Sequence, residues 1–263
     1  MRASAPAYSS DNPLVKRLRP LAIAAGLIMA WQLVVWLSGV PAFILPGPAE
    51  VAATWVKRAP TILHHAGITM LEIVLGLMIG VLVGLATAVM LSEWRRLRPW
   101  LLPILVISQA IPVFALAPIL VLWLGYGMAS KVAMAALIIF FPVTSALYDG
   151  LRRVDPLWLE AARSLGCSGT RLFRRVRLPA ALPAFASGLR VATAVAPIGA
   201  VVGEWVGSSA GLGYLMLHAN ARLQIDLMFA ALLTLALMAV ALYAIVDALL
   251  RRAVAWQPGE AES

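Results

Sequence analysis

Residues 160–166 read EAARSLG and residues 176–179 read VRLP, and they bracket the only long polar interruption between the apolar runs in the second half of the chain. Asp155 and Pro156 stand before it as a helix N-cap and a first-turn proline do. The next residues favour a helix until Gly166, whose freedom to adopt a positive φ predicts a stop. The sequence therefore predicts a short helix that ends at a glycine bend.

A second short helix is expected after this bend. Ser168 can cap it, and the helix should run through Val176 until Pro179 ends it. Arginines flank and interrupt both helices, so the stretch could also be an ordinary basic loop that stays in the cytoplasm. If both helices form, they are bent about a glycine and make a knob that projects from the rest of the chain.

The composition is that of a polytopic membrane protein. Of the 263 residues, 62% are hydrophobic and only 13% are charged, and the mean hydropathy is +0.90. The net charge of +9 could suggest a nucleic-acid partner, but the arginines lie between apolar runs and are not interleaved with exposed aromatic residues. No nucleic acid is therefore expected, and the lipid bilayer explains the charge pattern better. Cys167 is the only cysteine, which excludes an intrachain disulfide.

The knob carries a pattern, E-A-A-x3-G-x9-[IV]-x-L-P, that resembles the signature loop of the membrane subunits of ATP-binding-cassette (ABC) importers. In that family the knob fits a groove on a separate ABC ATPase subunit and passes nucleotide-driven motion to the membrane helices. The resemblance implies that small alanines let the helix sit deep, that the glycine makes the bend and that the glutamate gives a polar anchor. The implied ATPase-coupling residues are Glu160, Ala161, Ala162, Gly166, Val176, Leu178 and Pro179.

Apolar runs predict an all-α protein with six transmembrane helices, similar to the permeases of type I ABC importers. The spans are expected at residues 21–37, 67–91, 101–124, 131–147, 188–206 and 227–250. Prolines at 103, 112 and 118 predict that the third span is bent or broken. The expected organisation is a disordered tail (1–13), a transmembrane permease domain (14–252) that includes a cytoplasmic coupling loop (149–186), and a C-terminal tail (253–263).

Basic residues predict the orientation. Sixteen lysines and arginines flank one side of the six spans and four flank the other. The positive-inside rule then places both termini and the knob in the cytoplasm of a bacterium, with the spans in the inner membrane.

Two sets of glycines recur at every fourth residue, which places each set on one helical face. Such faces let two helix backbones approach closely, either within one subunit or across a dimer. The glycines of the two faces are Gly76, Gly80 and Gly84 in the second span, and Gly199, Gly203 and Gly207 in the fifth.

Proline, glycine and aromatic positions from Ile111 to Gly150 look like the nitrate, sulfonate and taurine branch of these permeases. Glu204, followed by Gly211 and Gly213, resembles the outer gate segment of that branch. An ionisable residue at membrane depth usually faces a pathway or a partner, but a glutamate that snorkels to the interface remains an alternative. Glu72 is expected near an outer membrane boundary.

Catalytic chemistry is not expected of this chain. It has no G-x-x-x-x-G-K-[ST] motif, so ATP must bind to a partner subunit, and it shows no catalytic constellation. No metal site is expected, because His64, His65 and His218 lack ligand spacing and are interpreted as surface or packing residues in outer loops.

The sequence thus predicts the permease subunit of an ABC importer for a small polar solute. The resemblance implies three partners: an ABC ATPase subunit, an extracytoplasmic solute-binding protein and a second permease copy, most simply as a homodimer. A non-pumping channel or an assembly scaffold is the alternative, although no filter sequence is evident. The solute stays open among sulfonates, taurine, nitrate and thiamine-pyrimidine precursors.

Overall fold

The computed structural model describes residues 13–94 and 96–256, so most of both expected tails lies outside it. Within the described residues every regular element is helical. The elements are α1 (Pro13–Ser38), α2 (Pro48–Glu93), α3 (Arg98–Ala110), α4 (Val113–Leu124), α5 (Met128–Arg152), α6 (Pro156–Ser164), α7 (Gly169–Leu172), the π-helix η1 (Phe173–Arg177), α8 (Leu178–Gly207), α9 (Leu212–Ala221) and α10 (Ile225–Ala253).

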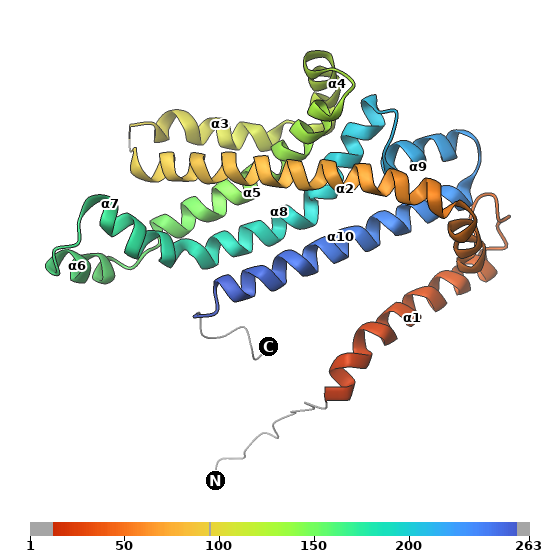
Figure 1. The fold of residues 1–263 in the computed structure, drawn as a ribbon, viewed down its shortest axis with the longest axis horizontal. Coiled ribbons are helices and arrows are strands. Elements are labelled where there is room, and N and C mark those ends of the chain that lie inside the picture. Colours follow the sequence, from red (N-terminus) through yellow and green to blue (C-terminus); the bar gives the residue numbers. More distant parts are fainter. Residues whose placement is uncertain (1–12, 95, 257–263) are drawn as a thin grey trace, which may run out of the picture.

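Three long helices, α2, α5 and α8, form the centre of the bundle, and α10 packs along α2 and α8 (Figure 1). Helix α1 diverges from this bundle, and its apolar span has no buried residue. The short helices α6 and α7 lie at one end of the molecule and α9 lies at the other. We refer to these as the α6 end and the α9 end.

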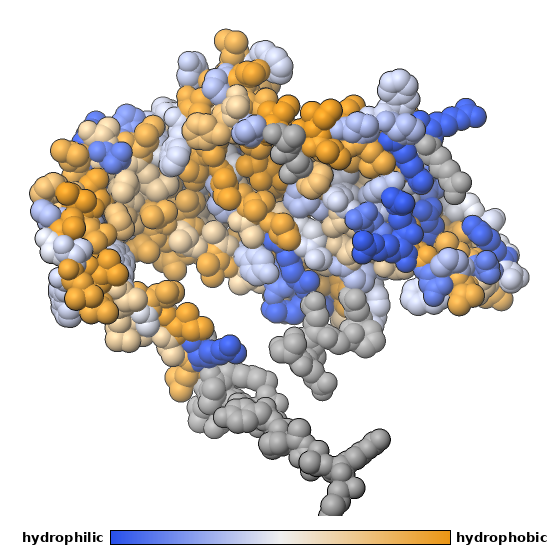
Figure 2. Space-filling model, turned by 180° about the vertical axis from the view of Figure 1, so that it is seen from behind, coloured by the Kyte–Doolittle hydropathy of each residue, from blue (hydrophilic) through white to orange (hydrophobic). Residues whose placement is uncertain are grey.

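The membrane spans agree with the predicted all-α class. Five described helices are long and apolar enough to cross a membrane, and α3 with α4 makes a sixth if the pair is counted as one broken span. The break bends the pair by 101°, and Pro112 lies at it as the N-cap of α4. Apolar side chains cover most of the face in Figure 2, whereas hydrophilic ones gather at the α6 end.

Two predicted helix ends are wrong. The helix that contains the expected second span begins well before residue 67, because α2 runs without interruption from Pro48. Pro179 does not end a helix, since it lies in the first turn of α8, directly after the π-helical turn η1. A proline in a first turn removes an N–H that the turn does not need, so the chain continues as helix into the span.

The glycine faces pack within this one chain. Gly76, Gly80 and Gly84 of α2 lie so close to α5 that an added β-carbon would crowd Ala135, Ile139 and Val143 in turn. On α8, Gly199 and Gly203 face α5 at Ala135 and Lys131, and Gly207 faces Val121 of α4. Because α5 receives glycines from both neighbours, the three central helices can approach closely.

Candidate functional site

Helix α6 is built by local capping. The Asp155 carboxylate accepts a hydrogen bond of 2.9 Å from the Leu157 N–H, and Pro156 fills the first turn. At the other end Gly166 has a φ of 79°. Its N–H donates to the Arg163 carbonyl, and the Cys167 N–H donates to the Ala162 carbonyl, each at 2.9 Å. These two bonds are a Schellman motif, which satisfies carbonyls that the helix leaves open.

Most of the α6 surface is not covered by the rest of the described chain. None of its residues is buried. Leu157, Trp158 and Leu165 are 70%, 60% and 88% exposed, and Glu160 and Ala161 are also exposed. Exposed apolar patches with polar surroundings are typical of surfaces that bind another protein.

Arg177 fastens the knob to the bundle. Its guanidinium forms an ion pair with Glu93 and donates to the Ser92 hydroxyl at 2.7 Å, both at the end of α2. It also donates to the Leu151 carbonyl of α5 at 3.4 Å. A cavity of about 400 Å³ lies beside it, lined by residues that include Arg98, Arg152, Arg163 and Arg177. Arg177 of η1 is therefore bonded directly to the ends of both α2 and α5.

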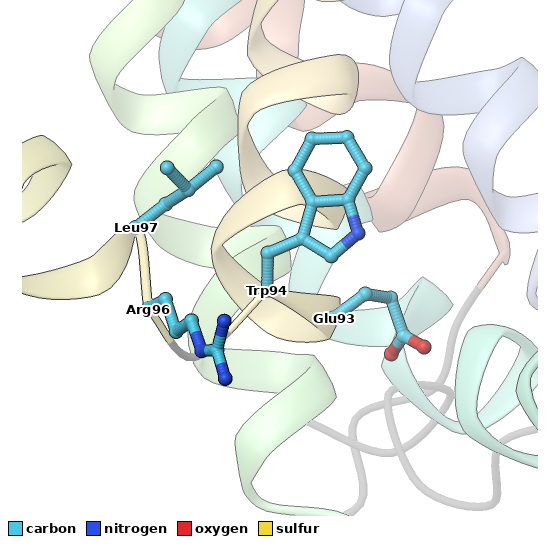
Figure 3. A pocket seen from close by; sticks show the side chains of 4 residues that line it. All are labelled: Glu93, Trp94, Arg96 and Leu97. Carbon is cyan, nitrogen blue, oxygen red and sulfur yellow. The ribbon is translucent and has the colours of Figure 1, made fainter.

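A second, open hollow of about 670 Å³ lies at the turn between α2 and α3. Glu93, Trp94, Arg96 and Leu97 line it (Figure 3). Trp94 is 57% exposed. A tryptophan beside an arginine at the end of a span is a common arrangement at a membrane interface, so this hollow needs no ligand to explain it.

At the α9 end, Glu204 is buried inside a hydrogen-bond network. Its side chain is 1% exposed. One carboxyl oxygen accepts from the Thr69 hydroxyl at 2.6 Å, and the other accepts from the backbone N–H groups of Gly213 and Tyr214. Gly211 has no room for a β-carbon beside this carboxyl group. Glu204 therefore connects the start of α9 to Thr69 of α2. Because it is buried, it does not snorkel to a water interface.

Several residues around Glu204 were missed as functional candidates. Glu72 is completely buried, and its nearest cation is Lys131, with 3.8 Å between Oε1 and Nζ. His65 lies in α2 and accepts a 3.0 Å hydrogen bond at Nδ1 from the Gly211 N–H, while His218 lies in α9. The expectation that the histidines occupy outer loops is therefore wrong. Charged residues inside apolar runs were the available signal.

Among the described residues, no group of three or more His, Cys, Asp or Glu side chains could hold a metal ion. The α6 end presents exposed apolar side chains, and the α9 end contains a buried polar network that joins α2, α8 and α9.

Comparisons with known proteins agree with this interpretation. Residues 76–255 match the family model described as "Binding-protein-dependent transport system inner membrane component". A "Probable ABC transporter permease protein" of Haemophilus influenzae is 58% identical over 90% of this chain and 97% of its own length. The "Formylaminopyrimidine transport permease protein ThiX" of Halalkalibacterium halodurans is 37% identical, over 75% of this chain and 79% of its own length.

A solved structure shares the fold. The chain titled "Crystal structure of an amino acid ABC transporter with histidines" aligns with a TM-score of 0.64 at 20% identity, covering 76% of this chain and 97% of that one. Sequence and fold lead to the same family. The protein belongs to the inner membrane components of binding-protein-dependent transport systems, and it is the permease subunit of an ABC importer.

Proposed function

We propose that α6, the Gly166 bend and η1 form the surface through which an ABC ATPase subunit drives this permease. The observation that carries the proposal is the exposure of Leu157 and Trp158 on α6 and of Leu165 at its C-cap, on a helix with no buried residue. Those side chains need a partner, and the motif residues Glu160, Ala161 and Ala162 lie on the same helix. The remaining motif residues, Val176, Leu178 and Pro179, lie in η1 and the start of α8, behind the bend.

The same proposal fixes the orientation. The α6 end faces the cytoplasm, where ATP is available, and the α9 end faces outward. The basic residues of the α6 end, among them Arg152, Arg163, Arg174 and Arg177, support this direction through the positive-inside rule. Both chain termini are then cytoplasmic.

Transport requires a moving outer gate, and we assign it to the turn between α8 and α9. Glu204, Gly211 and Gly213 belong to this segment. Gly211 and Glu204 are hydrogen-bonded to His65 and Thr69 of α2, and Gly213 donates to Glu204. A soluble binding protein would deliver a small polar solute to this side. The pathway itself would lie between this subunit and a second copy of it, as rigid-body rocking of the two halves requires.

Specificity is proposed to reside in the binding protein. The name of the ThiX relative makes formylaminopyrimidine the first solute to test. In proteoliposomes that hold this permease and its ATPase, uptake should be negligible until the binding protein is added on the α9 side. Selective, ATP-driven uptake without a binding protein would contradict this assignment, and uptake that needs no ATP would favour a channel.

Coupling through the bend can be tested separately. An asparagine tolerates the positive φ of Gly166, whereas a branched side chain does not. Because a β-carbon at this position meets no neighbour, packing does not differ between the two variants at that atom. Gly166→Asn should keep ATP-driven uptake, and Gly166→Val should reduce it at an unchanged amount of protein in the membrane. Equal uptake by both variants would show that the bend plays no part in coupling.

A further inference from the structure

The cavity of about 400 Å³ at the α6 end lies between the knob, which consists of α6, α7 and η1, and the ends of the long helices. Glu93 of α2 is the one carboxylate among its described lining residues. An arginine keeps its charge in proteins, so the lining carries three positive charges in excess. Membrane orientation explains why basic residues lie at this end, but not why four of them line one cavity. The four, one each from α3, α5, α6 and η1, are Arg98, Arg152, Arg163 and Arg177.

Two of these arginines are held in fixed positions. The Arg98 Nε donates to the Leu91 carbonyl at 2.7 Å, and its Nη2 donates to the Ser92 carbonyl at 2.9 Å. Both carbonyls belong to the last turn of α2, where helical donors are missing. They hold the guanidinium group without cancelling its charge. Arg177 is held beside it and is the one arginine of the four that is paired with a carboxylate among the described residues, that of Glu93.

The other two arginines, Arg152 and Arg163, lack such partners. Their side chains form no hydrogen bond or ion pair within the described part of the chain. The Arg152 guanidinium lies 5.4 Å from the centroid of the Tyr148 ring, and the Arg98 guanidinium lies 5.9 Å from the same centroid. Two positive charges thus share one aromatic ring. Because a guanidinium has five N–H donors and no acceptor, several donors around the cavity have no acceptor among the described residues.

The ligand chemistry that suits this lining is a phosphate group. A carboxylate offers two oxygens in one plane, whereas the oxygens of a phosphate point to the corners of a tetrahedron and can meet arginines from four elements. The planar fork of an arginine also binds phosphate through paired hydrogen bonds. The location agrees, since the cavity lies at the ends of α2 and α5, two helices long enough to span a membrane. Lipid headgroups lie at that depth.

We propose that this cavity binds a phosphate group, carried either by the headgroup of an anionic phospholipid or by a free phosphate ion. The bound group accepts hydrogen bonds from Arg163 of α6, from Arg152 of α5 and from the remaining N–H groups of Arg98. It thereby joins the knob to α3 and α5, in addition to the contacts that Arg177 makes. This binding requires neither the ATPase nor the proposed orientation.

Thermal unfolding of the purified permease in a neutral detergent tests the binding, because a ligand of the native state raises the unfolding temperature. Inorganic phosphate, exchanged for chloride at constant ionic strength, or phosphatidylglycerol added to the micelles should raise it by about 3–5 °C at roughly ten times the dissociation constant. The double variant Arg152→Gln, Arg163→Gln should lose this rise. The matched control is Arg153→Gln, Arg171→Gln, which removes two exposed charges of the same end that do not line the cavity, and it should keep the rise.

The two probes distinguish the sources of the phosphate. A rise with phosphatidylglycerol that phosphatidylcholine does not reproduce assigns the site to a lipid headgroup, and a rise with inorganic phosphate alone assigns it to the free ion. No rise with either probe, or an equal rise in both double variants, overturns the proposal. If Arg152→Gln, Arg163→Gln weakens only the binding of the ATPase, these arginines meet a carboxylate of that subunit, and the phosphate site is rejected.

Hydrogen–deuterium exchange tests whether the bound group joins the knob to the bundle. With the probe that binds, amide exchange across residues 156–172 should slow, because opening of the knob must then break the added contacts. Exchange in α9, at the other end of the molecule, is the control and should not change. Binding without slower exchange in the knob overturns the joining role, whereas the unfolding measurements decide the site itself.

Discussion

Gly211 packs directly against the Glu204 carboxyl group, so a β-carbon at this position would overlap the carboxyl atoms. Its φ of 109° and ψ of 164° belong to a region that only glycine adopts readily. Gly211→Ala should therefore lower the thermal unfolding temperature, because backbone strain costs about 1–3 kcal/mol and the overlap adds to it. Gly127→Ala is the control, since a β-carbon there meets no neighbour and its φ is −81°. Unfolding followed by tryptophan fluorescence in detergent measures both, and equal temperatures would contradict the packing described here.

Single residues also show the limit of what a sequence can predict. Glu204 was recognisable as a candidate because a charge interrupts an apolar span there. Glu72 gave the same signal, but its ion-pair partner Lys131 lies on α5, just as the Thr69 partner of Glu204 lies on α2 and not on α8. Only the register in which α2, α5 and α8 pack brings these groups together. No local pattern contains that register.

Among the elements, η1 is linked to both α2 and α5 through one arginine. Arg177 contacts α2 through Glu93 and Ser92 and contacts α5 through a backbone carbonyl. Arg177→Ala should reduce ATP-driven uptake severalfold, because movement of the knob would no longer reach both helices. Arg174→Ala is the matched control, since Arg174 is exposed on the same turn. Uptake that falls equally in both variants would point to a general loss of positive charge instead.

The contact between α2 and α5 tests helix packing. At Gly80 an added β-carbon would lie 2.8 Å from Ile139 and 2.9 Å from the Ala136 carbonyl oxygen. Overpacking of this kind costs about 1–3 kcal/mol, which exceeds the gain of about 1 kcal/mol in helix propensity. Gly80→Ala should therefore lower the unfolding temperature, while Gly67→Ala, with open space around it, should leave it unchanged or raise it. The opposite order would show that the two helices separate more easily than their contacts imply.

Element ends were harder to predict than element centres. Asp155 and Gly166 bound α6 as expected because capping is a local property of the chain. Pro179 led to a wrong helix end, because a proline can either stop a helix or occupy its first turn. Here it occupies the first turn of α8, directly after the π-helical turn η1. The start of α2 was missed for a different reason. Its first turns contact α10, for example through the hydrogen bond from the Thr54 hydroxyl to the Asp226 carboxylate, and such a contact between distant segments leaves no local pattern in the sequence.

At the scale of the whole molecule, the sequence predicted the class of fold and the family, because hydropathy and a short motif carry both. The directions in which the glycine faces point were not predictable. Gly76 and Gly199 both turn out to face Ala135 of α5, so these faces close the interior of one subunit. They are not available for a contact with a second copy of the chain.

The orientation of the whole molecule can be tested with one natural thiol. Cys167 follows the Gly166 bend, is partly exposed and is free. If the α6 end faces the cytoplasm, an impermeant maleimide should not label it in intact cells, and it should label it in inside-out vesicles stripped of ATPase. A Ser209→Cys variant that also carries Cys167→Ser should give the reverse pattern, because Ser209 is exposed at the α9 end. Labelling of Cys167 from outside intact cells would invert the topology, and with it the proposed positions of the ATPase and the binding protein.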